Sequence, residues 1–177
     1  DEYYSNLYGF YGDSTTFIPL DIDDWGAIGN LNIMINLDHE DDAGLQHLTL
    51  QLLSPALNSV ELAHGVQNSS IGPNWNSQDG GSLYYTIFDD GGPTSIYNGT
   101  PPFAGTYQPD ASLSIFNGQE LYGDWKLLVT NSHSSGGTID FTVMVEMDGN
   151  TEPEYPDYDD EYYSNLYGFY GDSTTFI

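Results

Sequence analysis

The sequence predicts an all-β protein, an antiparallel β-sandwich or a jelly roll. Apolar and polar residues alternate with a period of two in several stretches, no window holds a helical period, and Gly-rich turn sequences separate the stretches. One apolar and one polar face per strand is typical of antiparallel sheets, which pack one face on the core. Many short strands joined by such turns indicate two packed sheets.

Alternating apolar and polar residues indicate where the strands lie along the chain. In residues 30–37, Leu or Ile stands at every odd position, and in residues 138–147 Ile139, Phe141 and Val143 begin the same pattern. Turn sequences such as Asn117-Gly118 follow or precede the stretches. We expect strands at residues 30–37, 47–52, 57–66, 82–88, 124–130 and 138–147.

The charge balance excludes several classes of function. Asp and Glu number 27 against a single cation, Lys126, and the net charge is −26. One lysine cannot form a basic patch, so we expect no nucleic-acid partner and no docking on anionic lipid. No apolar run approaches the length of a membrane span, so we expect no membrane insertion. The absence of Cys excludes disulfides and thiolate metal sites.

The remaining composition favours an extracellular or cell-surface protein. Ser, Thr, Asn, Gln and Gly make up the polar bulk, Tyr is abundant and Cys is absent. No signal peptide is present and residue 1 is Asp, so we expect the sequence to be part of a longer chain.

An exact repeat frames the chain. Residues 1–18 and 160–177 both read DEYYSNLYGFYGDSTTFI, so the second copy starts 159 positions after the first. A tandem array of near-identical units is the simplest interpretation. A separate subunit with the same segment at both ends and a cloning duplication are the alternatives. We expect a Tyr-rich joining segment at 1–16, a sandwich at 17–147, an acidic Pro/Tyr linker at 148–161 and the start of the next repeat at 160–177.

Tyrosines are concentrated where consecutive units meet. Four lie in residues 3–11 and six in residues 155–170, out of 15 in the chain. Tyrosine provides a large contact area with a polar tip, so these rings either join one unit to the next or pack as a strand on their own domain. A cation bound by the acidic linker would stiffen the joint. The candidate inter-repeat contacts are Tyr3, Tyr4, Tyr8, Tyr11, Tyr155, Asp157, Tyr158, Asp159, Asp160, Tyr162 and Tyr163.

Residues 48–145 resemble the P domain of proprotein convertases, also called the P/Homo B domain. The motifs are LTLQLLSP at 48–55 and, in residues 88–147, Phe-Asp-Asp, Gly-Thr-x-Pro-Phe, Tyr-x-Pro, Leu-x-x-Phe-Asn-Gly and Gly-x-Trp-x-Leu-x-Val. Residues 18–42 match the first strands of the family more loosely. Gln46-His47 stands where members often carry Gly-Asp, and Thr142-Val143 stands where many carry Ser-Trp.

The resemblance implies a β-sandwich of jelly-roll type without catalytic residues. Such domains usually follow a subtilisin-like catalytic domain, support its folding and stability, and often bind calcium. Here the next stretch of chain is another copy of the same segment, so context points to a structural role, since a fold alone does not decide function.

Clustered carboxylates predict calcium sites in loops near residues 21–24, 38–42 and 89–90. Neighbouring carboxylates repel one another, and one lysine cannot relieve several clusters. Ca²⁺ takes six to eight oxygen ligands, which these loops could supply, and solvated negative loops are the alternative. The candidate ligands are Asp21, Asp23, Asp24, Asp38, Asp41, Asp42, Asp89 and Asp90.

We expect no enzyme activity. The four histidines show neither H-x-x-x-H nor H-E-x-x-H spacing, and no nucleophile elbow is present. The first interpretation of function is a calcium-stabilised repeat unit of an extracellular filament, stalk or adhesin, whose partners are copies of itself. The alternatives are an accessory P domain of a secreted subtilisin-like protease, and a module that binds a surface or a glycan through Trp25, Trp75 and exposed tyrosines.

Overall fold

Two β-sheets pack face to face, which confirms the predicted all-β sandwich. The structure is a computed structural model, and it describes residues 1–66 and 81–149. The first sheet contains β1 (Glu2–Tyr4), β2 (Tyr8–Phe10), β4 (Ile28–His39), β7 (Ser82–Phe88), β8 (Gly105–Tyr107) and β10 (Gly137–Met147). The second contains β3 (Ser14–Ile22), β5 (Leu48–Leu53), β6 (Ser59–His64) and β9 (Gly123–Asn131). Three short 3₁₀ helices complete the described residues: η1 (Gly44–His47), η2 (Ile96–Asn98) and η3 (Leu113–Phe116).

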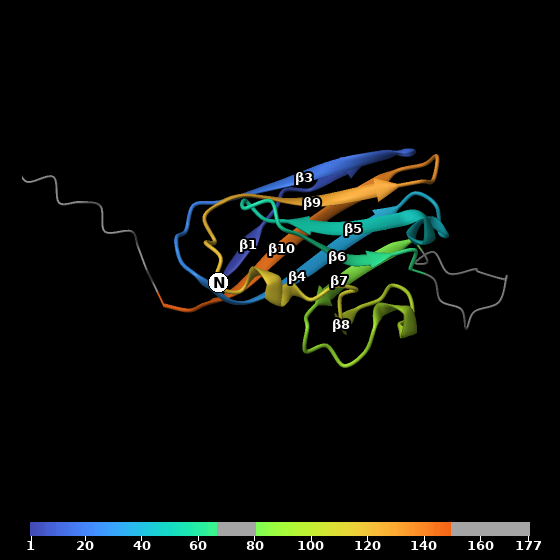
Figure 1. The fold of residues 1–177 in the computed structure, drawn as a ribbon. Helices are drawn as coiled ribbons and strands as arrows, with labels where there is room; N and C mark the ends of the chain where they lie inside the picture. Colours follow the sequence, from blue (N-terminus) through green and yellow to red (C-terminus); the bar gives the residue numbers. More distant parts are fainter. Residues whose placement is uncertain (67–80, 150–177) are drawn as a thin grey trace, which may run out of the picture.

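The strand order places the beginning of the chain at one side of both sheets (Figure 1). The first sheet runs β1-β10-β4-β7-β8. β2 pairs with the same edge of β10 as β1, at residues 137–139, while β1 pairs at residues 142–144. The second sheet runs β3-β9-β5-β6. The strand pairs are antiparallel except for β7 and β8, which are parallel. The outer strands at this side are therefore β1 and β2 in one sheet and β3 in the other.

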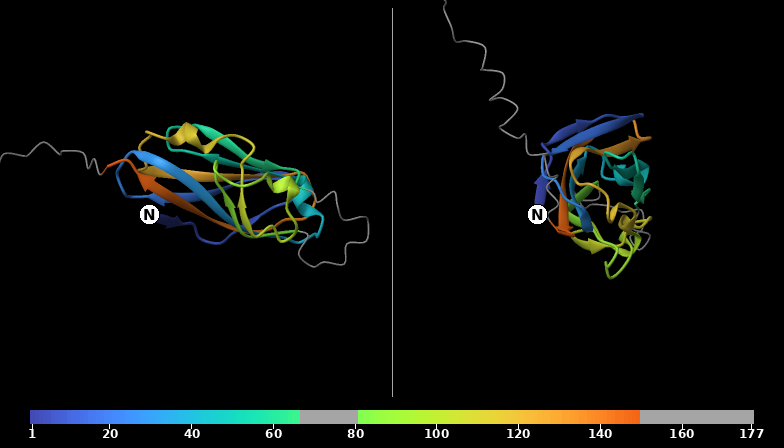
Figure 2. Two further views of the ribbon diagram at one scale, coloured as in Figure 1. Left: turned by 90° about the horizontal axis from the view of Figure 1, so that it is seen from below. Right: turned by 60° about the vertical axis from the view of Figure 1, so that its left-hand side comes forward.

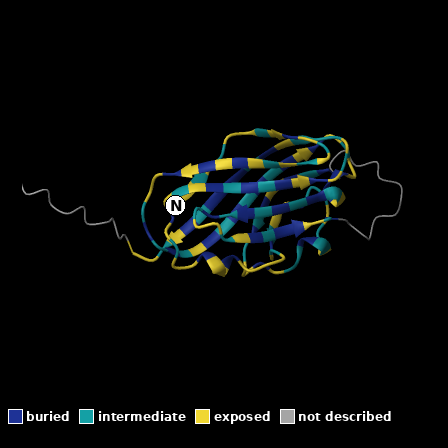
Figure 3. Ribbon diagram, turned by 45° about the horizontal axis from the view of Figure 1, so that its top comes forward, coloured by how far each residue is buried: buried dark blue, intermediate teal, exposed yellow. Residues whose placement is uncertain are grey.

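The core follows the alternation seen in the sequence. Trp125, Leu127 and Val129 of β9 are fully buried, and the indole N–H of Trp125 donates to the carbonyl oxygen of Leu121 at 2.8 Å. Figure 3 shows the same alternation of buried and more exposed residues along the strands. Lys126 is half-buried on the opposite face of β9.

The six expected strands coincide with observed ones, whereas the nine-residue strand β3 and the short strands β1, β2 and β8 were not predicted. β7 covers residues 82–88 as expected, and β4, β5, β6, β9 and β10 differ from the expected ranges by one to two residues at their ends. Residues 1–16, which we expected to be a joining segment, form β1, β2 and the start of β3. Among the residues described, no helix is long and apolar enough to cross a membrane.

Candidate interface between repeats

The first copy of the repeated segment, residues 1–18, is part of both sheets. Opposite β10, Glu2 pairs with Met144, Tyr3 with Val143, and Tyr8 with Ile139. Opposite β9, residues 14–18 pair with residues 131–127 in antiparallel register. The first strand of the chain lies beside β10 in both views of Figure 2. The segment therefore covers β10 and residues 127–131 of β9, which would otherwise be an edge with unpaired backbone groups.

Backbone hydrogen bonds fix the register of β1. The amide of Val145 donates to the carbonyl oxygen of Asp1 at 2.8 Å, and the terminal amino group of Asp1 donates to the carbonyl oxygen of Val145 at 2.7 Å. The amide of Ser5 donates to the carbonyl oxygen of Phe141 at 2.9 Å, and the Phe141 amide donates to Ser5 Oγ at 2.9 Å. The amides of Val145 and Phe141 would lose these hydrogen-bond acceptors if the segment detached from β10.

Apolar side chains anchor the segment in the core. Phe10 is 2% exposed and Ile18 is 0% exposed, while Tyr3 and Tyr8 pack against the core and are half-buried. Burying one side chain of this size contributes about 1.5–3 kcal/mol. The ring of Phe10 lies 5.6 Å from the ring of His39, centroid to centroid.

Glycines allow the segment to approach the β9–β10 turn closely. A Cβ atom added at Gly136 would overlap the carbonyl oxygen of Phe10, and one added at Gly12 would overlap the carbonyl oxygen of Ser134. The amide of Asp13 donates to the carbonyl oxygen of His133 at 2.8 Å in the same region. The contact between segment and turn is thus backbone against backbone, and it depends on glycine on both sides.

A tyrosine–carboxylate pair links the segment to the loop after β3. The hydroxyl of Tyr3 donates to Asp24 Oδ2 at 2.9 Å. Burial, and then the hydrogen bond to Asp24, raise the pKa of Tyr3 to about 12, because both disfavour the phenolate. Asp24, a predicted calcium ligand, therefore accepts a hydrogen bond from the repeated segment.

The opposite side of the segment presents apolar side chains to solvent. Exposed fractions are 63% for Tyr4, 66% for Leu7, 72% for Tyr11 and 56% for Phe17. These four are nearly half of the large hydrophobic residues that are strongly exposed in the described part of the chain. A segment with one buried and one apolar exposed side can bind its own sandwich and a neighbour at the same time.

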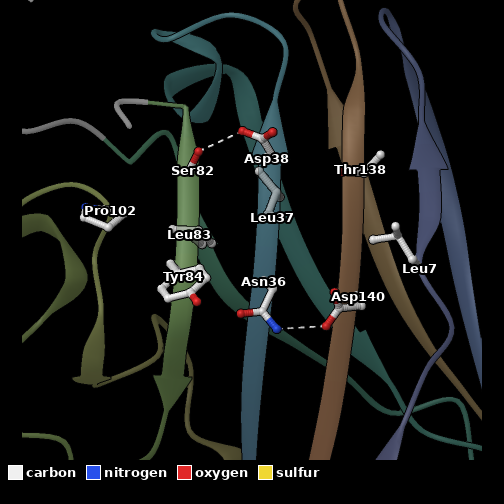
Figure 4. A pocket seen from close by; sticks show the side chains of 10 residues that line it. All are labelled: Leu7, Asn36, Leu37, Asp38, Ser82, Leu83, Tyr84, Pro102, Thr138 and Asp140. Atoms are coloured by element: carbon white, nitrogen blue, oxygen red, sulfur yellow. Dashed lines mark hydrogen bonds between the residues drawn. The ribbon is translucent and has the colours of Figure 1, made fainter. Parts of the chain in front are cut away.

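Leu7 also forms one wall of a groove on the outer face of the first sheet (Figure 4). The groove has a volume of about 530 Å³, and its opposite wall is formed by Tyr84 and Pro102. Across its floor, Asn36 Nδ2 donates to Asp140 Oδ1 at 2.9 Å. The repeated segment therefore shapes this surface as well as the edges of the sheets.

Three histidines lie near the turn that receives the segment. The rings of His39 and His133 are 5.3 Å apart, and those of His133 and His47 are 5.1 Å apart. The Nδ1 atom of His39 accepts a hydrogen bond from the Asp41 amide at 2.9 Å, and its buried Nε2 atom has no hydrogen-bond partner. Burial, and then the proximity of His133, lower the pKa of His39, while Asp41 opposes the shift. The neutral form of His39 is therefore favoured where its ring lies beside Phe10.

The predicted calcium ligands are hydrogen-bonded within their loops or lie on the surface. Asp90 accepts from Ser112 Oγ at 2.6 Å and from the amides of Leu113 and Ser114 at 2.8 and 3.0 Å, so it holds the start of η3. Asp89 accepts from the Gly91 amide at 2.7 Å.

The other loops show the same kind of local pairing. Asp38 accepts a hydrogen bond from Ser82 Oγ at 2.9 Å, and Asp41 accepts one from the Ala43 amide at 2.9 Å. Asp21, Asp23 and Asp42 are exposed. Within residues 1–66 and 81–149, none of the eight predicted ligands belongs to a group of three metal-ligating side chains.

The one such group in the described residues was not predicted from the sequence. Ligand atoms of Glu61, His64 and Asp110 lie within 4.8 Å of one another. The Nδ1 atom of His64 is 3.4 Å from Glu61 and 3.6 Å from Asp110. The hydroxyl of Tyr97 donates to Asp110 Oδ2 at 2.6 Å, and burial followed by this bond raises the pKa of Tyr97 to about 12. This group could hold a cation. Glu61 and His64 belong to β6, at the far side of the second sheet from the repeated segment, and Asp110 lies between β8 and η3.

The remaining predicted residues fall into two sets. Tyr155, Asp157, Tyr158, Asp159, Asp160, Tyr162, Tyr163 and Trp75 lie outside the described residues. Trp25, predicted as part of a glycan platform, stacks on Tyr122 with ring centroids 4.0 Å apart and planes 7° apart, so Tyr122 covers one face of its ring.

Comparisons with known proteins identify no family. No family model and no curated protein matches the chain. The solved complex of the Aeromonas sobria serine protease (ASP) with the chaperone ORF2 is similar over 84% of this chain and 28% of that chain, with 15% identity and a TM-score of 0.46. The serine protease of Aeromonas sobria is similar over 82% of this chain and 27% of that chain, with 18% identity and a TM-score of 0.45.

The chain thus spans less than a third of the length of these proteins. At such values the comparisons assign neither a family nor an activity. The resemblance to the P domain rests on the sequence motifs in residues 48–145.

Proposed function

We propose that the chain is a non-enzymatic structural module of an extracellular filament, stalk or adhesin, and that successive copies contact one another through the repeated segment. One observation carries the proposal. The segment that recurs at residues 160–177 is, at residues 1–18, built into both sheets of the sandwich. A sequence preserved letter for letter in two places has the same binding properties in both.

The exposed side of residues 1–18 supports contact with a neighbouring copy. Tyr4, Leu7, Tyr11 and Phe17 point away from the core of their own sandwich. Exposed apolar side chains, here on and next to the first strands of both sheets, are typical of surfaces that bind another protein. Tyrosine and phenylalanine are also the residues that contribute most to such contacts per side chain.

Removing the four exposed side chains tests the proposal. We expect the full chain to self-associate with rising concentration in analytical ultracentrifugation, and the variant Tyr4→Ser/Leu7→Ser/Tyr11→Ser/Phe17→Ser to stay monomeric. The matched control is Leu57→Ser/Ile115→Ser, which removes two residues that are 77% and 51% exposed outside the segment and should leave association unchanged. A full chain that is monomeric at all concentrations, or a control that loses association equally, would contradict the proposal.

Calcium is proposed as a stabiliser of the acidic loops and of the linker. A net charge of −26 on 177 residues is a large self-repulsion, which divalent cations would reduce. The loops at residues 21–24, 38–42 and 89–90 offer carboxylate oxygens, the ligands that Ca²⁺ prefers. A cation at Asp157, Asp159 and Asp160 would stiffen the connection between units.

A second candidate function is the accessory domain of a secreted subtilisin-like protease. The P-domain motifs of residues 48–145 favour it, and both solved structures named above contain a serine protease. The two candidates differ in what flanks the sandwich along the chain. Co-expression with a subtilisin-like catalytic domain separates them, because an accessory domain would raise the yield of active protease and a filament module would not.

A further inference from the structure

We infer that residues 160–177 of one copy occupy, on a second copy of the sandwich, the place that residues 1–18 occupy here. The inference rests on the proposed function and specifies the contact. Neighbouring bodies would be joined by strands hydrogen-bonded into the sheets of the next body, in addition to contacts between side chains. The partner is a second copy of this chain, and the surface that receives it is the edge formed by β10 and by residues 127–131 of β9.

The receiving edge is specific for this segment. Its backbone groups on β10 pair with β1 and β2, and those on β9 pair with β3. The side chains of Phe10 and Ile18 are buried against this edge. At Gly136 the edge contacts the backbone of the segment, and only a residue without a side chain fits there. A segment of different sequence would leave these sites unfilled or overlapping.

The second copy of the segment reproduces every element that the edge recognises. Shifting each residue by 159 positions places Tyr162 for Tyr3, Phe169 for Phe10 and Ile177 for Ile18. Because the sequences are identical, exchanging one segment for the other conserves all contacts with the edge. Tether length and concentration then decide which segment binds.

Each described body has one such edge, and residues 1–18 fill it. The same 177 residues contain two segments that fit it. With its own edge filled, the second segment is available to a separate chain, on which it takes the place of residues 1–18.

The positions of the chain ends limit how far apart joined bodies can be. Asp1 is hydrogen-bonded to Val145, near the end of β10, so the segment enters and the body leaves at the same end of the sandwich (Figures 1 and 2). Twelve residues, 148–159, separate Met147 from Asp160. An extended chain of this length spans at most about 43 Å, which is close to the length of the twelve-residue strand β4. Joined bodies must therefore be immediate neighbours.

Engineered cysteines test the inference without background, because the chain has no Cys. Glu2 lies opposite Met144 and next to the hydrogen-bonded pair of Asp1 and Val145. Such non-hydrogen-bonded pairs bring Cα atoms to about 4.5 Å, within the range for a disulfide. Glu161 is the counterpart of Glu2 in the second segment. One full chain carries Met144→Cys, a second full chain of distinct mass carries Glu161→Cys, and the two are mixed under mild oxidation.

We expect a disulfide-linked heterodimer between Met144→Cys and Glu161→Cys, and its loss when the second chain also carries Phe169→Asp and Ile177→Asp. A chain with Asn165→Cys in place of Glu161→Cys is the out-of-register control and should give no heterodimer. A chain with Glu2→Cys in place of Glu161→Cys reports whether residues 1–18 also exchange between chains. The double cysteine variant Glu2→Cys/Met144→Cys should close within one chain and proves that the pair can form.

Two results would overturn the inference. One is the absence of the heterodimer while Glu2→Cys/Met144→Cys closes. The other is a double variant Met144→Cys/Glu161→Cys in which the disulfide forms only within one chain and never between two chains. If either occurs while the self-association described above persists, the strand contact is wrong and the structural function stands. If association is also absent, both fail.

Discussion

The fit between Gly136 and the repeated segment makes Gly136→Ala a direct test of how the segment is held. A Cβ at this position would overlap the carbonyl oxygen of Phe10 and lie 3.1 Å from the carbonyl carbon of Phe10 and from the Cα of Tyr11. All three are backbone atoms, so no change of rotamer relieves the overlap, and the segment or the turn must move. Overpacking of this kind costs about 1–3 kcal/mol, and withdrawing Phe10, now 2% exposed, adds part of its burial energy.

We therefore expect Gly136→Ala to lower the free energy of unfolding by about 2–4 kcal/mol, which lowers Tm by about 4–16 °C in a domain of this size. Thermal denaturation followed by circular dichroism measures the shift. The matched control is Gly9→Ala in the same segment, where an added Cβ has an ordinary contact of 3.9 Å with the carbonyl oxygen of Gly137. Equal melting of the two variants would refute the argument that the segment is packed against the turn.

Three further predictions concern charge. Because burial and His133 lower the pKa of His39, the unfolded chain binds more protons, so the free energy of unfolding should fall as pH drops from about 6.5 towards the folded pKa. His39→Gln should flatten that slope in denaturant titrations, and an unchanged slope would contradict the assignment to His39. The pKa of Tyr3 is raised to about 12, so stability should be lost as pH rises from about 10 to 12; Tyr3→Phe should weaken this loss, and an ultraviolet titration with all tyrosines ionising near 10 would contradict it. Tm should fall in EDTA and recover with Ca²⁺, and an identical melt in both would end the calcium proposal.

The alternation of residues was enough to locate six strands, but not the nine-residue β3, whose buried alternation begins only at Ile18, nor the short strands. β4 and β10 carry apolar residues at every second position over most of their length, which only a strand with one buried face explains. β1, β2 and β8 have three residues each, too few to show a period. The repeat and its tyrosines left open whether the Tyr-rich segment joins units or packs as a strand on its own domain; its pairing with β10 is set by tertiary contacts and could not be read from the sequence.

The sites depend on geometry that spacing does not reveal. Glu61 and His64 are three positions apart, a spacing that would put them on opposite faces of a regular strand. A register shift in the pairing of β5 with β6, between Leu50 and Gln51, falls within this stretch, and both side chains reach Asp110. The acidic loops also contain contacts that the sequence did not reveal: Asp90 accepts hydrogen bonds from Ser112, Leu113 and Ser114 at the start of η3.

A cryo-electron microscopy reconstruction of the assembled protein tests the central claim most directly. The account predicts continuous strand density along β9 and β10 of each body, connected through residues 148–159 to the end of β10 in the adjacent body. Bodies whose β9 and β10 edges are open, or filled only by a segment with no connection to a neighbour, would contradict it.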